Sequence, residues 1–161
     1  MKLNTKDAYT RVYCYDPGGT TGFALLDLDH VKRTITVKEL GEFSTWANIT
    51  THSEAIKPNE CFLYEDFKLR IITANLIPVE VIGVIRYICG VKGLPMFKQM
   101  PHERKVAVEW YKELNSIDNS THWFSALSHG IVFVNKSFSG KDKWTLLFHK
   151  SVVESTLKRK K

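Results

Sequence analysis

The sequence has 161 residues, of which 43% are hydrophobic and 25% are charged. These values are ordinary for one soluble globular domain, and they exclude an acidic, disordered chain. Lysine and arginine outnumber aspartate and glutamate by 23 to 17, which gives a formal net charge of +6 at pH 7. A positive charge of this size permits a polyanionic partner without requiring one.

The cysteines and the apolar stretches indicate the cellular compartment of the protein. Cys14, Cys61 and Cys89 form no Cys-x-x-Cys pair, so neither a disulfide framework nor a cysteine zinc site is expected. The polar segment 1–10 lacks the apolar core of a signal peptide. No apolar stretch reaches the roughly 18 residues of a membrane span. We therefore predict a cytoplasmic protein that has no membrane partner.

The first half of the chain predicts strands and one helix. Apolar or alternating runs that are bounded by turn signals predict strands at 11–15, 23–28 and 34–38. Their close succession favours an antiparallel meander. Spaced apolar residues then predict an amphipathic helix over 44–57, and a short apolar run predicts a buried strand at 61–64.

The second half alternates between strand and helix signals, which favours parallel pairing. In chain order it predicts a helix at 78–89, a strand at 95–100, helices at 102–114 and from a Ser120-Thr121 cap to about 134, and a last helix within 140–161. The predicted fold class is α/β, with a mixed five-stranded sheet flanked by helices. We expect a single domain over 1–161, with flexible tails at 1–10 and 158–161.

Asp16 ends the first predicted strand and opens a glycine-rich turn that runs to Gly22. A turn with so few side chains lets a ligand approach the backbone closely. It is not a P-loop, because no Gly-Lys-Ser/Thr follows. It also resembles the phosphate turn of actin-like ATPases, but the chain is too short for their two lobes. Taken alone, Asp16 fits a plain Asx turn that leads into a hairpin.

Two other groups of polar residues are candidates for chemistry. Glu65 and Asp66 end the strand at 61–64, where carboxylates are costly unless they are solvated, paired or bound to a cation. His122, Ser125 and His129 share one helical face at about 100° per residue. Histidines seven residues apart are rarely a metal pair by themselves, so a polar stripe with ordinary hydrogen bonds is the alternative.

Together these motifs resemble the RuvC-like Holliday junction resolvases of the RNase H-like superfamily, particularly the small phage-type ones. Residues 16–24 resemble the family's first strand end with its catalytic aspartate, and Tyr64-Glu65-Asp66-Phe67 resembles the second acidic strand end with its metal-binding glutamate. Gln99-Met100-Pro101 with Lys105 resembles a later strand and helix start, and 122–129 resembles the final catalytic helix. The resemblance covers about residues 11–134 in the family's order.

The resemblance implies an RNase H-like fold and a metal-dependent, structure-selective DNA endonuclease that cuts branched DNA. The implied catalytic residues are Asp16, Glu65, Lys105, His122 and Ser125. Asp16, Glu65 and His122 would hold Mg²⁺ or Mn²⁺, with His122 as a nitrogen ligand or as the group that positions the attacking water. Lys105 would stabilise charge on the phosphate.

One position departs from the family's pattern. The last helix of the family usually carries Asp-Ala-Leu, and this chain has Ser125-Ala126-Leu127 in its place. A serine is a poor direct ligand for Mg²⁺, which prefers carboxylates and water. A catalytically weak or inactive relative that binds branched DNA or a protein partner is therefore the alternative function.

The resemblance also implies partners. DNA contacts are expected at Phe67, Lys68, Arg70, Arg104 and Lys105, with a basic tail at 158–161. A homodimer is implied, because a four-way junction has two symmetric strands to cut. The apolar stretch 76–88 is either the dimer helix or a buried core helix. The phage-type motifs imply the cytoplasm of a bacterial host cell as the location.

Overall fold

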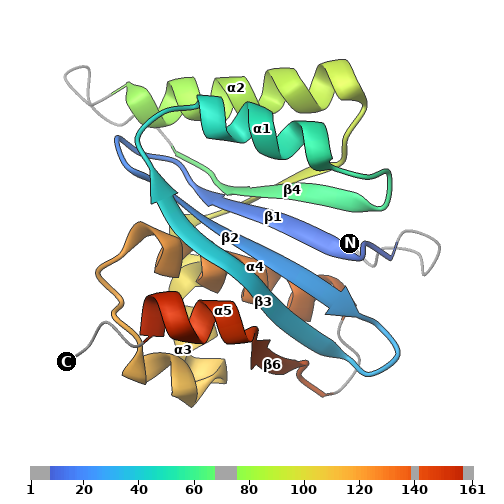
Figure 1. The fold of residues 1–161 in the computed structure, drawn as a ribbon, viewed down its shortest axis with the longest axis vertical. Helices are drawn as coiled ribbons and strands as arrows, with labels where there is room; N and C mark the ends of the chain where they lie inside the picture. The colour runs from blue at the N-terminus through green and yellow to red at the C-terminus, as the bar shows by residue number, and fades with distance from the viewer. Residues whose placement is uncertain (1–7, 68–75, 139–141, 158–161) are drawn as a thin grey trace.

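A computed structural model describes residues 8–67, 76–138 and 142–157, and its described residues form a six-stranded sheet flanked by helices (Figure 1). The strands are β1 (Arg11–Asp16), β2 (Thr21–Asp29), β3 (Thr34–Phe43), β4 (Glu60–Glu65), β5 (Met96–Gln99) and β6 (Thr145–Phe148). The helices are α1 (Ala47–Ala55), α2 (Ile77–Lys92), α3 (Arg104–Trp110), α4 (His122–Phe138) and α5 (Lys150–Val152), with short segments η2 (Pro101–Glu103), η3 (Lys112–Ser116) and η4 (Val153–Leu157).

The sheet is mixed, as the sequence predicts, with the strand order β5-β4-β1-β2-β3-β6. The strands β1, β2 and β3 form the predicted antiparallel meander. The pairs β1–β4 and β4–β5 are parallel, because a helix or a helix-sized connection separates the two strands of each pair along the chain. The carboxyl ends of β1, β4 and β5 therefore lie at one edge of the sheet.

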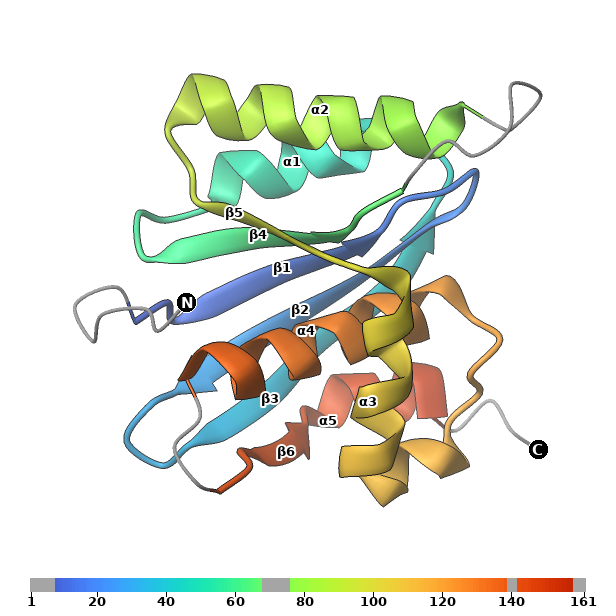
Figure 2. The ribbon, with the colours of Figure 1, turned by 180° about the vertical axis from the view of Figure 1, so that it is seen from behind.

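Both faces of the sheet are buried, which explains why β1 and β4 read as continuous apolar runs. Alternate residues face opposite sides. Cys14 and Leu63 belong to the core under α4, whereas Tyr15 and Tyr64 belong to the core under α1 and α2. Figure 2 shows the same arrangement from behind, with α1 and α2 on one side of the sheet and α4, α3 and α5 on the other.

The predicted count of five strands is wrong, because the first part of the predicted helix at 140–161 is a sixth strand. Strand β6 pairs in parallel with β3, and the chain becomes helical only from Lys150. A short apolar run such as Thr145–Phe148 fits a strand and a helix equally well. The contacts that decide come from elsewhere in the chain. The Oη of Tyr111 donates to the carbonyl oxygen of Trp144 at 2.6 Å, and the backbone N–H of Trp144 donates to Asn135 Oδ1 at 3.1 Å.

Two helix predictions also need correction. The helix expected over 102–114 is divided into η2, α3 and η3, because Tyr111 has extended backbone angles and turns its side chain into the network with Trp144. The expected cap at Ser120-Thr121 is not the one used, since the Thr121 hydroxyl donates to the Asp118 carbonyl oxygen. None of the helices in the described ranges is long and apolar enough to cross a membrane.

Candidate active site

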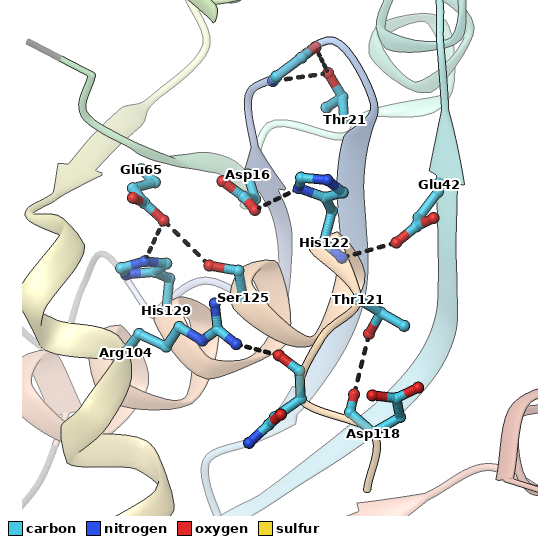
Figure 3. A network of polar contacts seen from close by, with 12 residues as sticks. Asp16, Thr21, Glu42, Glu65, Arg104, Asp118, Thr121, His122, Ser125 and His129 are labelled. Atoms are coloured by element: carbon cyan, nitrogen blue, oxygen red, sulfur yellow. Dashed lines mark hydrogen bonds and ion pairs between the residues drawn. The ribbon is translucent and has the colours of Figure 1, made fainter.

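Asp16 and Glu65 meet at the carboxyl ends of two neighbouring parallel strands (Figure 3). Tyr15 of β1 pairs with Tyr64 of β4, so Asp16 and Glu65 are the next residues along the two strands. Because Cys14 and Leu63 face α4, the alternation of the strands places Asp16 and Glu65 on that face as well. Both side chains are largely buried, with exposed fractions of 18% and 20%.

Helix α4 reaches these carboxylates because glycines let it lie very close to the sheet. A Cβ at Gly22, the residue of β2 opposite Asp16, would stand 2.1 Å from the backbone carbonyl carbon of His122. A Cβ at Gly130 would stand 2.5 Å from both Cys14 Sγ and Leu26 Cδ1. At Gly22 the obstacle is the helix backbone, so a side chain there would displace the helix, and at Gly130 a side chain would have to displace the side chains of Cys14 and Leu26. These two glycines therefore fix the height of α4 above β1 and β2.

The first turn of α4 contacts acidic residues on both sides. His122 Nδ1 lies 3.2 Å from Asp16 Oδ2, and the backbone N–H of His122 donates to Glu42 Oε1 at 2.7 Å. A carboxylate at a helix N-terminus satisfies an otherwise unpaired N–H and complements the helix dipole. Glu42 therefore holds the end of the helix that carries His122. Glu42 was not among the predicted site residues, because the alternation that predicts the third strand stops at Lys38, whereas β3 continues to Phe43.

The next turns of α4 hold Glu65. Its Oε2 accepts a hydrogen bond from Ser125 Oγ at 3.1 Å and lies 2.7 Å from His129 Nε2. The other ring nitrogen of His129, Nδ1, lies 3.1 Å from Oε1 of Gln99 on β5. The predicted polar stripe on α4 thus faces the acidic strand ends. Gln99 completes the network, although the sequence analysis quoted it only as part of a strand end.

Burial and the surrounding charges shift the pKa values of the two carboxylates in opposite directions. Burial, followed by the charge of Glu65, raises the pKa of Asp16 above its ordinary value, and the contact with His122 opposes the rise. Burial also acts to raise the pKa of Glu65, but the hydrogen bonds from His129 and Ser125 and the charge of Arg104 outweigh it, and the pKa of Glu65 is lowered. The two carboxylates therefore repel each other, and Glu65 is the more strongly held as an anion.

This donor set suits a cation that keeps some of its water. Within the described ranges, no three histidine, cysteine, aspartate or glutamate side chains converge as a complete set of metal ligands. Asp16 Oδ1 and Glu65 Oε1 have no hydrogen-bond partner among the described residues, whereas the second oxygen of each carboxylate is engaged. Mg²⁺ commonly binds through one or two carboxylates, with waters and substrate phosphates as its other ligands. Two mutually repelling carboxylates, each with an unengaged oxygen, fit that pattern.

The predicted basic residues are only partly placed. Arg104 is half-buried on α3, where its guanidinium carbon lies 5.4 Å from the centre of the Phe124 ring and its charge acts on Glu65. Lys105 is exposed on the same helix, and Phe67 is partly exposed just beyond β4. Lys68 and Arg70 lie outside the described residues, as does the basic tail at 158–161. Of the predicted DNA-binding residues that the structure describes, Arg104 is the one whose charge acts on the acidic pair.

The second acidic residue at the end of β4 has a different partner. Asp66 Oδ2 lies 3.0 Å from Lys98 Nζ on β5, and its backbone N–H donates to the Gln99 carbonyl oxygen at 2.8 Å. Lys98 balances the charge of Asp66, so Asp66 is not drawn into the pair formed by Asp16 and Glu65. Of the two neighbouring acids in the sequence, Glu65 is the one at the site.

The strand order, the helix layers and the paired acidic strand ends define an RNase H-like fold of the RuvC-like resolvase type. The chain is similar to Thermus thermophilus RuvC in complex with a Holliday junction substrate, with a TM-score of 0.62 and 14% identity over 78% of this chain and 93% of that one. It is also similar to the fowlpox virus resolvase in complex with Holliday junction DNA, with a TM-score of 0.56 and 9% identity over 78% and 97% of the two chains. No protein-family model and no curated protein matches the sequence. At these identities the similarity establishes the fold, and the activity has to be inferred from the residues of the site.

The close approach at Gly22 gives a direct test of the site's construction. Gly22→Ala should force the first turn of α4 away from β2, separate His122 from Asp16, and lower the free energy of unfolding by about 1–3 kcal/mol. Chemical denaturation measures the change. Gly90→Ala in α2 is the matched control, because a Cβ there has no atom within 4 Å, and it should be neutral or stabilising. A Gly22→Ala variant as stable as the wild type would contradict the packing described.

Proposed function

We propose that this protein is a divalent-metal-dependent endonuclease that cuts branched DNA, as a Holliday junction resolvase does. The observation that carries the proposal is the pair Asp16 and Glu65, which lies at adjacent strand ends under α4 in a resolvase fold. Two similar structures contain Holliday junction DNA, which supports branched DNA as the substrate class. The phage-type origin and the bacterial cytoplasm as its location rest on the motif resemblance.

The side chains of this site divide the work of hydrolysis. Asp16 and Glu65 would hold the cation, which when bound stabilises negative charge on the phosphate and activates water. His122 turns Nδ1 toward Asp16, and its ring is 48% exposed, which leaves Nε2 to face a water. Of the two roles that the sequence left open for His122, we propose that it orients the attacking water and accepts its proton at Nε2.

The DNA backbone would be bound by the basic residues around the acidic pair. Arg104 and Lys105 begin α3 next to Glu65, and we propose that they contact phosphates near the cleaved bond. Phe67, partly exposed after β4, is proposed to stack or wedge against the bases at the junction. Each phosphate contact should make binding weaken with salt, with a log–log slope of roughly −0.9 per contact.

Ser125 favours a second candidate, an inactive protein that binds branched DNA or a protein partner. The family's acid is replaced there by a hydroxyl that donates to Glu65 Oε2 rather than offering a carboxylate oxygen. The site then has two carboxylates instead of three, which weakens the case for two bound metals. This candidate keeps the fold and the DNA surface and differs only in whether the phosphodiester bond is cut.

We propose that the protein acts as a homodimer through the outer face of α2. One face of α2 is buried against the sheet through Val81, Ile82 and Ile85, so part of the stretch 76–88 is core. The opposite face is exposed and mixes apolar side chains with Glu80 and Arg86. On it, Tyr87 and Val91 have exposed fractions of 71% and 70%. A second copy is the occupant that the function requires, because the two symmetric strands of a junction need two sites.

Cleavage of a labelled four-way junction in the presence of Mn²⁺ or Mg²⁺ tests the proposed activity. The wild type should make paired, symmetric nicks, and Asp16→Asn should reduce the rate by about 100-fold or more, because one of the two charged cation ligands is lost. Asp142→Asn, at an exposed aspartate beyond α4, should cleave normally. Tight binding without cleavage by the wild type would favour the inactive binder, and absence of both would contradict the assignment to DNA.

Sedimentation of the free protein tests the dimer. The wild type should sediment as a dimer, and Tyr87→Glu should sediment as a monomer, because the carboxylate would be buried at the interface. Val31→Glu is the control, since Val31 is 95% exposed in the β2–β3 turn and should leave the dimer intact. A wild type that remains monomeric at tens of micromolar would overturn the homodimer.

A further inference from the structure

His129 is buried with no exposed surface, yet both of its ring nitrogens have polar partners. Nε2 lies 2.7 Å from Glu65 Oε2, and Nδ1 lies 3.1 Å from Gln99 Oε1. Gln99 is itself the residue of β5 that pairs with Glu65 of β4 in the ladder. Glu65, His129 and Gln99 therefore form a closed group that ties α4 to the ends of two strands.

The side-chain hydrogen bonds that Glu65 accepts from α4 all fall on one of its oxygens. Ser125 and His129 are one helical turn apart, and both contact Oε2, while Oε1 has no partner among the described residues. At neutral pH a glutamate is a carboxylate, which only accepts hydrogen bonds, so His129 donates its Nε2–H to Oε2. The terminal torsion of a glutamate is otherwise soft. Two donors on one oxygen therefore set the direction of the other.

We propose that His129 is a positioning residue for Glu65. With Ser125 it engages Oε2, so that Glu65 presents Oε1 alone to the cation that it would share with Asp16. The side-chain amide of Gln99 contacts Nδ1 from the other side and keeps Nε2 directed at Glu65. The amide oxygen accepts when Nδ1 carries a proton, and the amide N–H donates when it does not. The inference rests on the proposed function, and it explains how α4 serves the site without the acid that Ser125 replaces. His129 itself does not contact the cation.

Binding of Mn²⁺ alone to the full chain without DNA, measured by titration calorimetry, tests this role. The wild type should bind Mn²⁺, and Glu65→Gln should lose most of the binding. His129→Leu keeps a similar volume but lacks the donor, and it should weaken the affinity by about 10–100-fold. His129→Gln places an N–H the same number of bonds from the backbone as Nε2 of histidine, and it should recover most of the lost affinity.

Thermal melting of each variant separates positioning from folding. If His129→Leu fails to fold, Ser125→Ala with His129→Gln carries the test, because Ser125→Ala removes only one donor and should weaken Mn²⁺ binding by about tenfold. A folded His129→Leu that binds Mn²⁺ as tightly as the wild type would overturn the positioning role and leave the proposed function intact. An equal loss in His129→Gln and His129→Leu would also overturn it. A wild type that neither binds Mn²⁺ nor cleaves junctions would overturn both proposals.

Discussion

The site depends on how closely α4 lies over the ends of β1 and β2. Gly22 has no side chain, and the backbone of His122 occupies the space where a Cβ would stand. This contact brings His122 to Asp16 and, on the following turns of the same helix, brings Ser125 and His129 to Glu65. Glu42 holds the start of the helix from the other side of Gly22. One close approach therefore positions the side chains of α4 that contact the two carboxylates.

Helix α4 stabilises the anionic form of the two carboxylates to different degrees. Glu65 receives hydrogen bonds on one oxygen, which favour its anionic form and outweigh its burial. Asp16 is buried and faces the charge of Glu65, which raises its pKa, and the contact with His122 and a smaller contribution from His129 oppose that rise. Such a site lowers its electrostatic energy by taking up a cation, because the cation removes the repulsion that burial increases. The carboxyl ends of β1 and β4 therefore carry a local negative charge, although the net charge of the chain is positive.

The sequence predicts the parts of the fold that local patterns determine. The meander, the strand before Glu65 and the apolar helix predicted at 78–89 follow from turn signals, alternation and a proline start. The order of these elements predicts the mixed sheet, and the resemblance of the motifs implies the RNase H-like fold. The sixth strand is not predictable in this way, because Trp144, which precedes it, is held by Tyr111 and by Asn135 of α4, and both belong to other elements. Local patterns also do not predict the contacts of Glu42, Gln99 and His129, because each of these residues acts through a partner on another element.

In the proposed function, Asp16 and Glu65 together bind a cation through the oxygens that the rest of the site leaves unengaged. Crystals of the full chain soaked in Mn²⁺, with diffraction recorded at a wavelength where manganese scatters anomalously, test it most directly. We expect an anomalous peak within bonding distance of Asp16 Oδ1 and Glu65 Oε1, and the loss of that peak in Glu65→Gln. A peak that avoids these two oxygens, or a site that stays empty at millimolar Mn²⁺, would contradict it.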